Sequence, residues 1–156
     1  MIFVKITAVM FFIGQIAACG GGGETTVPTA PPSRDTSANI GDHVVHFNAL
    51  STEQLSPEVA RAYNIVRSKN RAMLNVSVLE AAGGKAVTAT VTVKTVNLTG
   101  QLKNVVMRKI QEQDAIYYIG ETPVANRETL VFDITVTPDG TSEPFQLKFQ
   151  RQFYSD

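Results

Sequence analysis

The chain has 156 residues with 14 basic and 14 acidic side chains, so its net charge at pH 7 is zero. This balance excludes a nucleic-acid reader that depends on bulk basic charge, and equally a polyacidic tail protein. A single cysteine, Cys19, excludes a disulfide framework and any cysteine-cluster metal site. With only two histidines, a multi-histidine site would need carboxylate or water ligands. We therefore predict neither a metal nor another cofactor.

Residues 1–18 have the features of a secretion signal. Lys5 is the only charge, and it precedes a short apolar run over residues 6–13. Because about 20 apolar residues are needed to span a bilayer, the run favours a cleaved signal peptide over a transmembrane helix.

The signal ends in a motif that resembles the bacterial lipobox, which is an aliphatic residue, two small residues and cysteine. Here these are Ile16, Ala17, Ala18 and Cys19. The resemblance implies that the cysteine is diacylated, becomes the new N-terminus and is then N-acylated. Several acyl chains give stable anchoring where one alone is marginal. We predict lipidation at Cys19; the alternative is a plain signal peptide with an incidental cysteine.

Residues 19–40 are predicted to be the lipidated cysteine and a flexible linker. Glycine, proline, serine and threonine dominate this segment, and such a composition cannot form a core. Gly20 stands where an aspartate would resemble the inner-membrane retention signal of enteric bacteria. We therefore expect a periplasmic protein anchored to the outer membrane, in its inner leaflet.

Residues 41–156 are predicted to form one domain of alternating apolar and polar residues. The seven predicted strands cover residues 43–49, 73–79, 87–94, 102–110, 116–121, 130–137 and 145–153. Pro138-Asp139-Gly140-Thr141 is a strong hairpin signal between the last two. The pattern predicts a mainly β fold, an antiparallel immunoglobulin-like β-sandwich of about seven strands. The Cys…Trp…Cys hallmark of antibody domains is missing, and a half-open barrel is the alternative.

One short helix is predicted between the first two strands, over about residues 57–66. Ser56 is suited to the N-cap, Pro57 to the first turn, and Glu58 to the positive end of the helix dipole. An apolar stripe at spacings of four and three consists of Val59, Tyr63 and Val66.

The densest polar cluster surrounds this helix. Its candidate binding residues are His46, Asn48, Glu58, Arg61, Tyr63, Arg67, Ser68 and Arg71. The functional interpretation is a pocket for an anion or a peptide terminus, with Arg67 or Arg71 as a planar fork for a carboxylate or phosphate. The structural interpretation is a helix C-terminus whose cations favour the negative end of the dipole, followed by a solvated loop.

Two residue pairs have orientations that follow from strand geometry. His43 and His46 are three apart on one predicted strand, so they point to opposite faces and cannot easily chelate one metal. Tyr117 and Tyr118 are neighbours, so one should face outward. An outward tyrosine would contact a partner or a sugar, or would only pack across strands.

Part of the chain resembles a known family. The residues that carry the likeness are Val45-His46-Phe47-Asn48-Ala49, Leu55-Ser56-Pro57-Glu58-Val59-Ala60, Tyr63, Ile65, Arg67-Ser68 and Leu74-Asn75-Val76-Ser77-Val78. They resemble an uncharacterised domain-of-unknown-function family of small secreted or lipid-anchored proteins in gammaproteobacteria, pseudomonads included. The resemblance implies a periplasmic β-rich domain over residues 41–156 and carries no assigned activity.

Two functional hypotheses follow. The first is a lipid-anchored periplasmic module without enzymatic activity that binds an envelope protein or glycan, through exposed strand edges or an Arg67–Arg71 rim. The second is a small envelope enzyme or small-ligand binder that uses the cluster of His46, Glu58 and Arg67. The sequence has no nucleophile-elbow pattern and no recognisable catalytic constellation, so we predict that the protein is not an enzyme.

Overall fold

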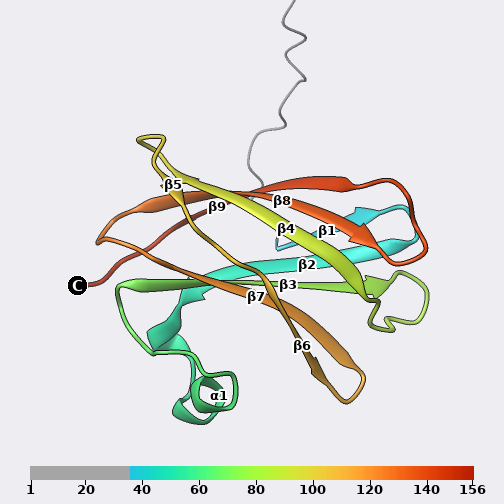
Figure 1. The fold of residues 1–156 in the computed structure, drawn as a ribbon, viewed down its shortest axis with the longest axis horizontal. Coiled ribbons are helices and arrows are strands. Elements are labelled where there is room, and N and C mark those ends of the chain that lie inside the picture. The colour runs from blue at the N-terminus through green and yellow to red at the C-terminus, as the bar shows by residue number, and fades with distance from the viewer. Residues whose placement is uncertain (1–35) are drawn as a thin grey trace, which may run out of the picture.

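The computed structural model describes residues 36–156, which form two antiparallel sheets packed face to face with a helix outside one of them (Figure 1). The elements are β1 (Ser37–Ile40), β2 (His43–Ser51), the 3-10 turn η1 (Thr52–Gln54), α1 (Pro57–Ala62), β3 (Arg71–Glu80), β4 (Ala89–Asn97), β5 (Leu102–Lys103), β6 (Arg108–Glu112), β7 (Ala115–Pro123), β8 (Thr129–Pro138) and β9 (Phe145–Gln152). The strand orders are β1-β2-β3-β7-β6 and β5-β4-β8-β9. The predicted antiparallel sandwich is confirmed, whereas the predicted signal peptide and Cys19 lie outside the described residues.

The alternation of side chains along each strand determines the core. On β8, Leu130, Phe132, Ile134 and Val136 are all buried, and the residues between them are only partly buried. β2 alternates in the same way: His43, Val45, Phe47 and Ala49 point inward, whereas His46 and Asn48 are exposed. The period of two places one face of each sheet in the core, and the predicted opposition of His43 and His46 is confirmed.

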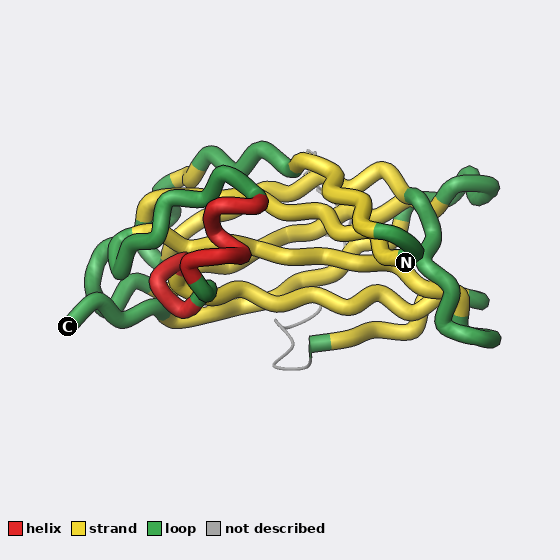
Figure 2. The backbone as a smooth tube through the Cα atoms, turned by 90° about the horizontal axis from the view of Figure 1, so that it is seen from below, coloured by secondary structure: helices red, strands yellow, loops and turns green. Residues whose placement is uncertain are grey.

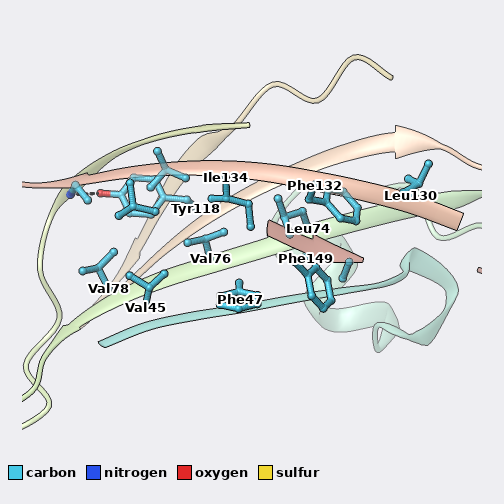
Figure 3. Packing of buried hydrophobic residues seen from close by; sticks show 14 of the residues in the cluster. Val45, Phe47, Leu74, Val76, Val78, Tyr118, Leu130, Phe132, Ile134 and Phe149 are labelled. Carbon is cyan, nitrogen blue, oxygen red and sulfur yellow. Dashed lines mark hydrogen bonds between the residues drawn. The ribbon is translucent and has the colours of Figure 1, made fainter. Parts of the chain in front are cut away.

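Aromatic side chains link the two sheets across this core (Figure 3). The ring of Phe149 on β9 lies 5.4 Å from that of Phe47 on β2, edge to face, and is stacked 5.9 Å from that of Phe132 on β8. The Tyr118 hydroxyl on β7 accepts a 2.7 Å hydrogen bond from the Ala89 amide on β4. Burial raises the pKa of the Tyr118 phenol, so this oxygen remains a neutral hydroxyl inside the sandwich.

The first strand lies within the segment that was predicted to be the linker. β1 pairs with β2, from Ser37 opposite His46 to Ile40 opposite His43. Ile40 is buried in the core. The folded residues therefore begin before residue 41, because a short polar segment gains its strand structure from the partner strand.

The segment over residues 102–110, predicted as one strand, forms two. β5 pairs with β4 in the four-stranded sheet, whereas β6 pairs with β7 in the five-stranded sheet. Residues 104–107 therefore cross from one sheet to the other (Figure 1). This crossing explains why the alternation over the segment is irregular.

The predicted helix is confirmed in place and start but is shorter, and its buried stripe differs. Ser56 caps α1 by accepting a hydrogen bond from the Val59 amide. The helix ends at Ala62, and Asn64 then has a φ of +54°. Ala60 and Ile65 are buried, whereas Val66 is 67% exposed. The predicted stripe of Val59, Tyr63 and Val66 was therefore wrong in its first and last members: Val59 is 39% exposed, and the helix does not reach residue 66.

Glu128, just before β8, joins three neighbouring segments. Its carboxylate lies 2.7 Å from the Lys103 ammonium and accepts hydrogen bonds from the Asn97 side chain at 2.9 Å and the Ala125 amide at 2.8 Å. The Glu128 and Lys103 side chains are only 11% and 15% exposed. Burial alone would raise the pKa of Glu128, but the hydrogen bonds from Lys103, Ala125 and Asn97 outweigh it and hold the pKa below its usual value.

We expect Glu128→Gln to lower the free energy of unfolding at pH 7 by about 1–3 kcal/mol, because Lys103 loses its charged partner. A lowered folded-state pKa stabilises the fold fully above the ordinary carboxyl value of 4.5, and this contribution is lost as the pH falls through the folded-state pKa. Urea unfolding at several pH values should show the difference between the two proteins shrinking below about pH 4.5. A difference that stays constant with pH would contradict a role for the charge. Glu143→Gln, at an exposed site, serves as the control.

Candidate functional site

The outer face of the five-stranded sheet has an apolar strip where a solvent-facing surface would be polar. Met73 on β3 and Ile119 on β7 point outward, yet they are only 7% and 4% exposed. They are covered by the flap, which we define as residues 52–70 and which contains α1. Figure 2 shows the helix lying across the strands of this sheet. The flap and the strip form a second hydrophobic cluster, separate from the main core.

Hydrogen bonds join the two ends of the flap to each other. Thr52, which is completely buried, donates from its hydroxyl to the Val66 carbonyl at 2.9 Å and accepts from the Ser68 amide at 3.0 Å. The Arg67 guanidinium donates to the Glu53 carbonyl at 2.8 Å. Arg108 on β6 donates to the Tyr63 carbonyl, which holds the middle of the flap over the sheet. The flap is therefore held in a defined position on the folded domain by hydrogen bonds.

A pocket of about 260 Å³ lies between the flap and the sheet. Seven aliphatic or methionine side chains line it: Leu50, Leu55, Val59, Ile65, Met73, Ile110 and Ile119. Five residues with polar groups complete the lining: Asn48, Tyr63, Asn75, Glu112 and Tyr117. An apolar pocket with a few convergent polar groups is the usual form of a small-ligand site.

The polar groups of the pocket come from four strands and the flap. Asn48 on β2 stands directly opposite Asn75 on β3, and Asn75 is opposite Ile119 on β7. The Asn75 side-chain oxygen is buried and has no hydrogen-bond partner within residues 36–156. The pKa of the Tyr63 phenol is raised, first by its hydrogen bond with the Glu112 carboxylate, then by burial and by the charge of Glu112. Tyr63 is thus a neutral phenol next to a carboxylate.

A second hollow of about 200 Å³ adjoins the pocket at the outer edge of β2. Its lining consists of Thr36, His46, Phe47, Asn48 and Asn75. Asn48 and Asn75 line both hollows. The two hollows are therefore neighbours, and we call the pair the depression.

The predicted site residues fall into two groups. Three of them line the depression: His46 the smaller hollow, Tyr63 the pocket, and Asn48 both. The other five line neither hollow. Glu58 and Arg61 pair with each other at 3.7 Å, Arg67 binds the Glu53 carbonyl, Ser68 fastens the flap, and Arg71 lies 3.8 Å from the Glu121 carboxylate. The structure does not bring Glu58 or Arg67 into a hollow with His46.

Sequence reasoning missed two polar residues of the pocket, Asn75 and Glu112. Tyr117 was recognised only as one of two tyrosines, and the prediction that one faces outward is confirmed because Tyr118 is buried in the core. A usable signal existed for Asn75, which lies between the buried residues Leu74 and Val76. Glu112 gives no such signal, because its neighbours Gln111 and Gln113 are exposed. Nothing in the sequence, however, indicates that their strands are assembled beside the flap.

Two kinds of site were not found among residues 36–156. These residues contain no group of three or more histidine, cysteine, aspartate or glutamate side chains arranged to hold a metal ion. They also contain no helix that is long and apolar enough to cross a membrane.

The fold and the outer-face depression define a two-sheet antiparallel β-sandwich with a flap-covered pocket. The chain belongs to the family described as "Domain of unknown function (DUF4426)", whose model matches residues 37–156. The predicted membership of a family of unknown function is confirmed. No curated protein matches the chain.

Solved structures agree with this assignment. A crystal structure of a DUF4426 family protein from Pseudomonas aeruginosa PAO1 is 36% identical, with a TM-score of 0.67, over 77% of this chain and 94% of that one. A copper-bound variant of FetP from uropathogenic Escherichia coli strain F11 is 11% identical, with a TM-score of 0.56, over 77% and 95% of the two chains. As-isolated FetP from the same strain, expressed in the periplasm, has 11% identity, coverages of 77% and 93%, and a TM-score of 0.55. The two FetP structures show similarity of fold alone.

Proposed function

We propose that the protein is a lipid-anchored, non-enzymatic binding module of the periplasm. In this proposal Cys19 carries the acyl chains in the inner leaflet of the outer membrane, and the domain binds another envelope component, a protein or a glycan. The lipobox-like sequence before Cys19 supports the anchor. The depression on the outer face of the five-stranded sheet supports the binding role.

The pocket under the flap is the observation that carries the binding proposal. Apolar side chains such as Met73 and Ile119 have been placed on the outer face, where strand alternation would ordinarily put polar ones. The flap buries these two side chains but does not fill the space beside them, so a pocket of about 260 Å³ remains. Asn48, at its margin, is exposed and can be reached by a partner.

Site-specific photo-crosslinking in intact cells tests the binding proposal. A photoreactive amino acid replaces Asn48 at the margin of the pocket, and in a matched control replaces Gln150, which is exposed on β9 of the other sheet. We expect a defined adduct from position 48 and none from position 150. Protease and glycosidase digestion of the adduct then separates a protein from a glycan. Identical adducts from both positions, or none from position 48, would refute a binding role for this face.

The anchor is tested separately with Cys19→Ala. We expect the full-length protein to incorporate an alkyne-labelled fatty acid and to sediment with the outer membrane, and the variant to do neither, because cysteine is the acylated residue. A variant that keeps the label would place the lipid elsewhere. A wild-type protein without label would overturn the anchor and leave the binding proposal standing.

A further inference from the structure

Two of the polar groups that line the pocket are hydrogen-bond acceptors, on Glu112 and Asn75. Glu112 supplies a carboxylate, which only accepts hydrogen bonds. The Asn75 side-chain oxygen is an acceptor, buried and unpartnered within the described part of the chain. A buried acceptor without a donor is costly, so the pocket favours an occupant that donates hydrogen bonds.

The charge of Glu112 is not neutralised by a neighbouring cation. None of the ion pairs within residues 36–156 involves this carboxylate. Arg108, two residues earlier on β6, is engaged elsewhere: it donates to the Tyr63 carbonyl and lies 3.8 Å from the Glu121 carboxylate. The pocket lining therefore includes one exposed carboxylate without a paired cation, and this carboxylate is complementary to a cation.

The walls around Glu112 suit a cation with an apolar body. Tyr63 from the flap and Tyr117 from β7 both line the pocket. Aromatic faces attract ammonium groups, and a carboxylate beside them adds a charge-assisted hydrogen bond. The remaining lining is aliphatic, which matches an alkyl chain.

We propose that the pocket under the flap binds an alkylammonium group, with the ammonium between Glu112, Tyr63 and Tyr117 and the alkyl chain along Ile110 and Ile119. At about 260 Å³ the pocket has the size for a side chain or a small amine. A lysine side chain of a partner protein and a free alkylamine share this chemistry. The inference rests on the proposed binding function and names its ligand class.

Titrations followed by NMR test the proposal on the full-length protein in detergent. The probes are n-pentylammonium and 1-pentanol, which share the alkyl chain but differ in charge. We expect n-pentylammonium to bind saturably, to shift the amide signals of Asn75 and Tyr117, and to bind at least ~10-fold more tightly than 1-pentanol, since a charge-assisted hydrogen bond is worth about a factor of ten or more. Equal affinities for the two probes, or no saturable binding, would overturn the proposal.

Two variants locate the recognition. Glu112→Gln should weaken n-pentylammonium ~10-fold and leave 1-pentanol unchanged, because only the charge is removed. Glu58→Gln is the matched control, since Glu58 is an exposed carboxylate on the flap outside the pocket; it should change neither affinity. Tyr117→Leu should lower the affinity for n-pentylammonium more than that for 1-pentanol, whereas Tyr117→Phe, which keeps the aromatic ring, should retain the affinity for n-pentylammonium. An unchanged ammonium affinity in Glu112→Gln would contradict the assigned site.

A final comparison distinguishes the sources of the group. Nα-acetyl-lysine N-methylamide represents a lysine of a partner protein, and its Nε-acetylated form lacks the charge. Tighter binding of the lysine derivative than of n-pentylammonium indicates a protein partner, whereas the reverse indicates a free amine. If no amine binds but crosslinking at position 48 captures a partner, the ligand class is wrong and the binding function stands.

Discussion

Replacing Phe149 by alanine is expected to lower the free energy of unfolding by about 3–5 kcal/mol. Phe149 is 2% exposed and is the one ring of its cluster that contacts an aromatic ring from each sheet, Phe47 and Phe132. Its removal leaves a cavity between the sheets, and the two aromatic contacts are lost as well. For a domain whose total stability is about 5–15 kcal/mol, such a loss is a large share.

Urea unfolding followed by circular dichroism measures this loss. Gln150→Ala, at the next position on β9 and exposed on the outer face, is the matched control and should change stability by less than about 0.5 kcal/mol. Phe149→Leu should lie between, since it retains most of the buried volume. A loss below about 1 kcal/mol in Phe149→Ala would mean that the sheets close over the cavity.

Replacing Gly120 by leucine is expected to cost about 3 kcal/mol, near the upper end for overpacking. A β-carbon at Gly120 would lie 2.6 Å from the Val105 methyl, 2.7 Å from the Met107 sulfur and 3.1 Å from the Val106 carbonyl oxygen. These atoms belong to the segment that crosses between the sheets. Glycine is needed here because that segment passes directly over β7, and every larger side chain must push it away.

Thermal unfolding of a graded pair, Gly120→Ala and Gly120→Leu, should show melting temperatures that fall in that order. Adding Val105→Ala to Gly120→Ala should recover part of the loss, because it removes one of the clashing methyls. Gly140→Ala is a useful contrast: its φ is +88° and nothing lies within 4 Å of its β-carbon, so Val105→Ala should not rescue it. Recovery in both backgrounds would refute the steric explanation.

The main strands could be predicted because they obey a local rule. Residues 130–137 alternate so regularly that the buried face of β8 can be read directly from the sequence. β1 could not be predicted, since Ser37–Ile40 has no pattern of its own and becomes a strand through pairing with β2. The crossing over residues 104–107 depends on which sheet each half joins, and this is a tertiary choice.

The site was predicted less completely for a similar reason. His46, Asn48 and Tyr63 lie close in sequence to the helix and were predicted to belong to one cluster, and all three line the depression. Asn75 and Glu112 enter it only because β3 is followed in the sheet by β7 and then β6. Arg67 was predicted as a candidate to bind a carboxylate or phosphate, but its guanidinium donates a hydrogen bond to the Glu53 carbonyl of the flap. Composition identifies charges, whereas packing decides which of them are free.

The strand order also has a kinetic consequence. The central pairings, β3 with β7 and β4 with β8, join segments far apart in the chain. The five-stranded sheet cannot be completed before β7, which ends at Pro123, and the four-stranded sheet cannot be completed before β9, which ends at Gln152. Such non-local topologies fold in milliseconds to seconds, after synthesis at about 5–20 residues per second. A nascent chain therefore emerges without a finished domain. If the protein is exported as proposed, it can enter a translocation channel without first having to be unfolded.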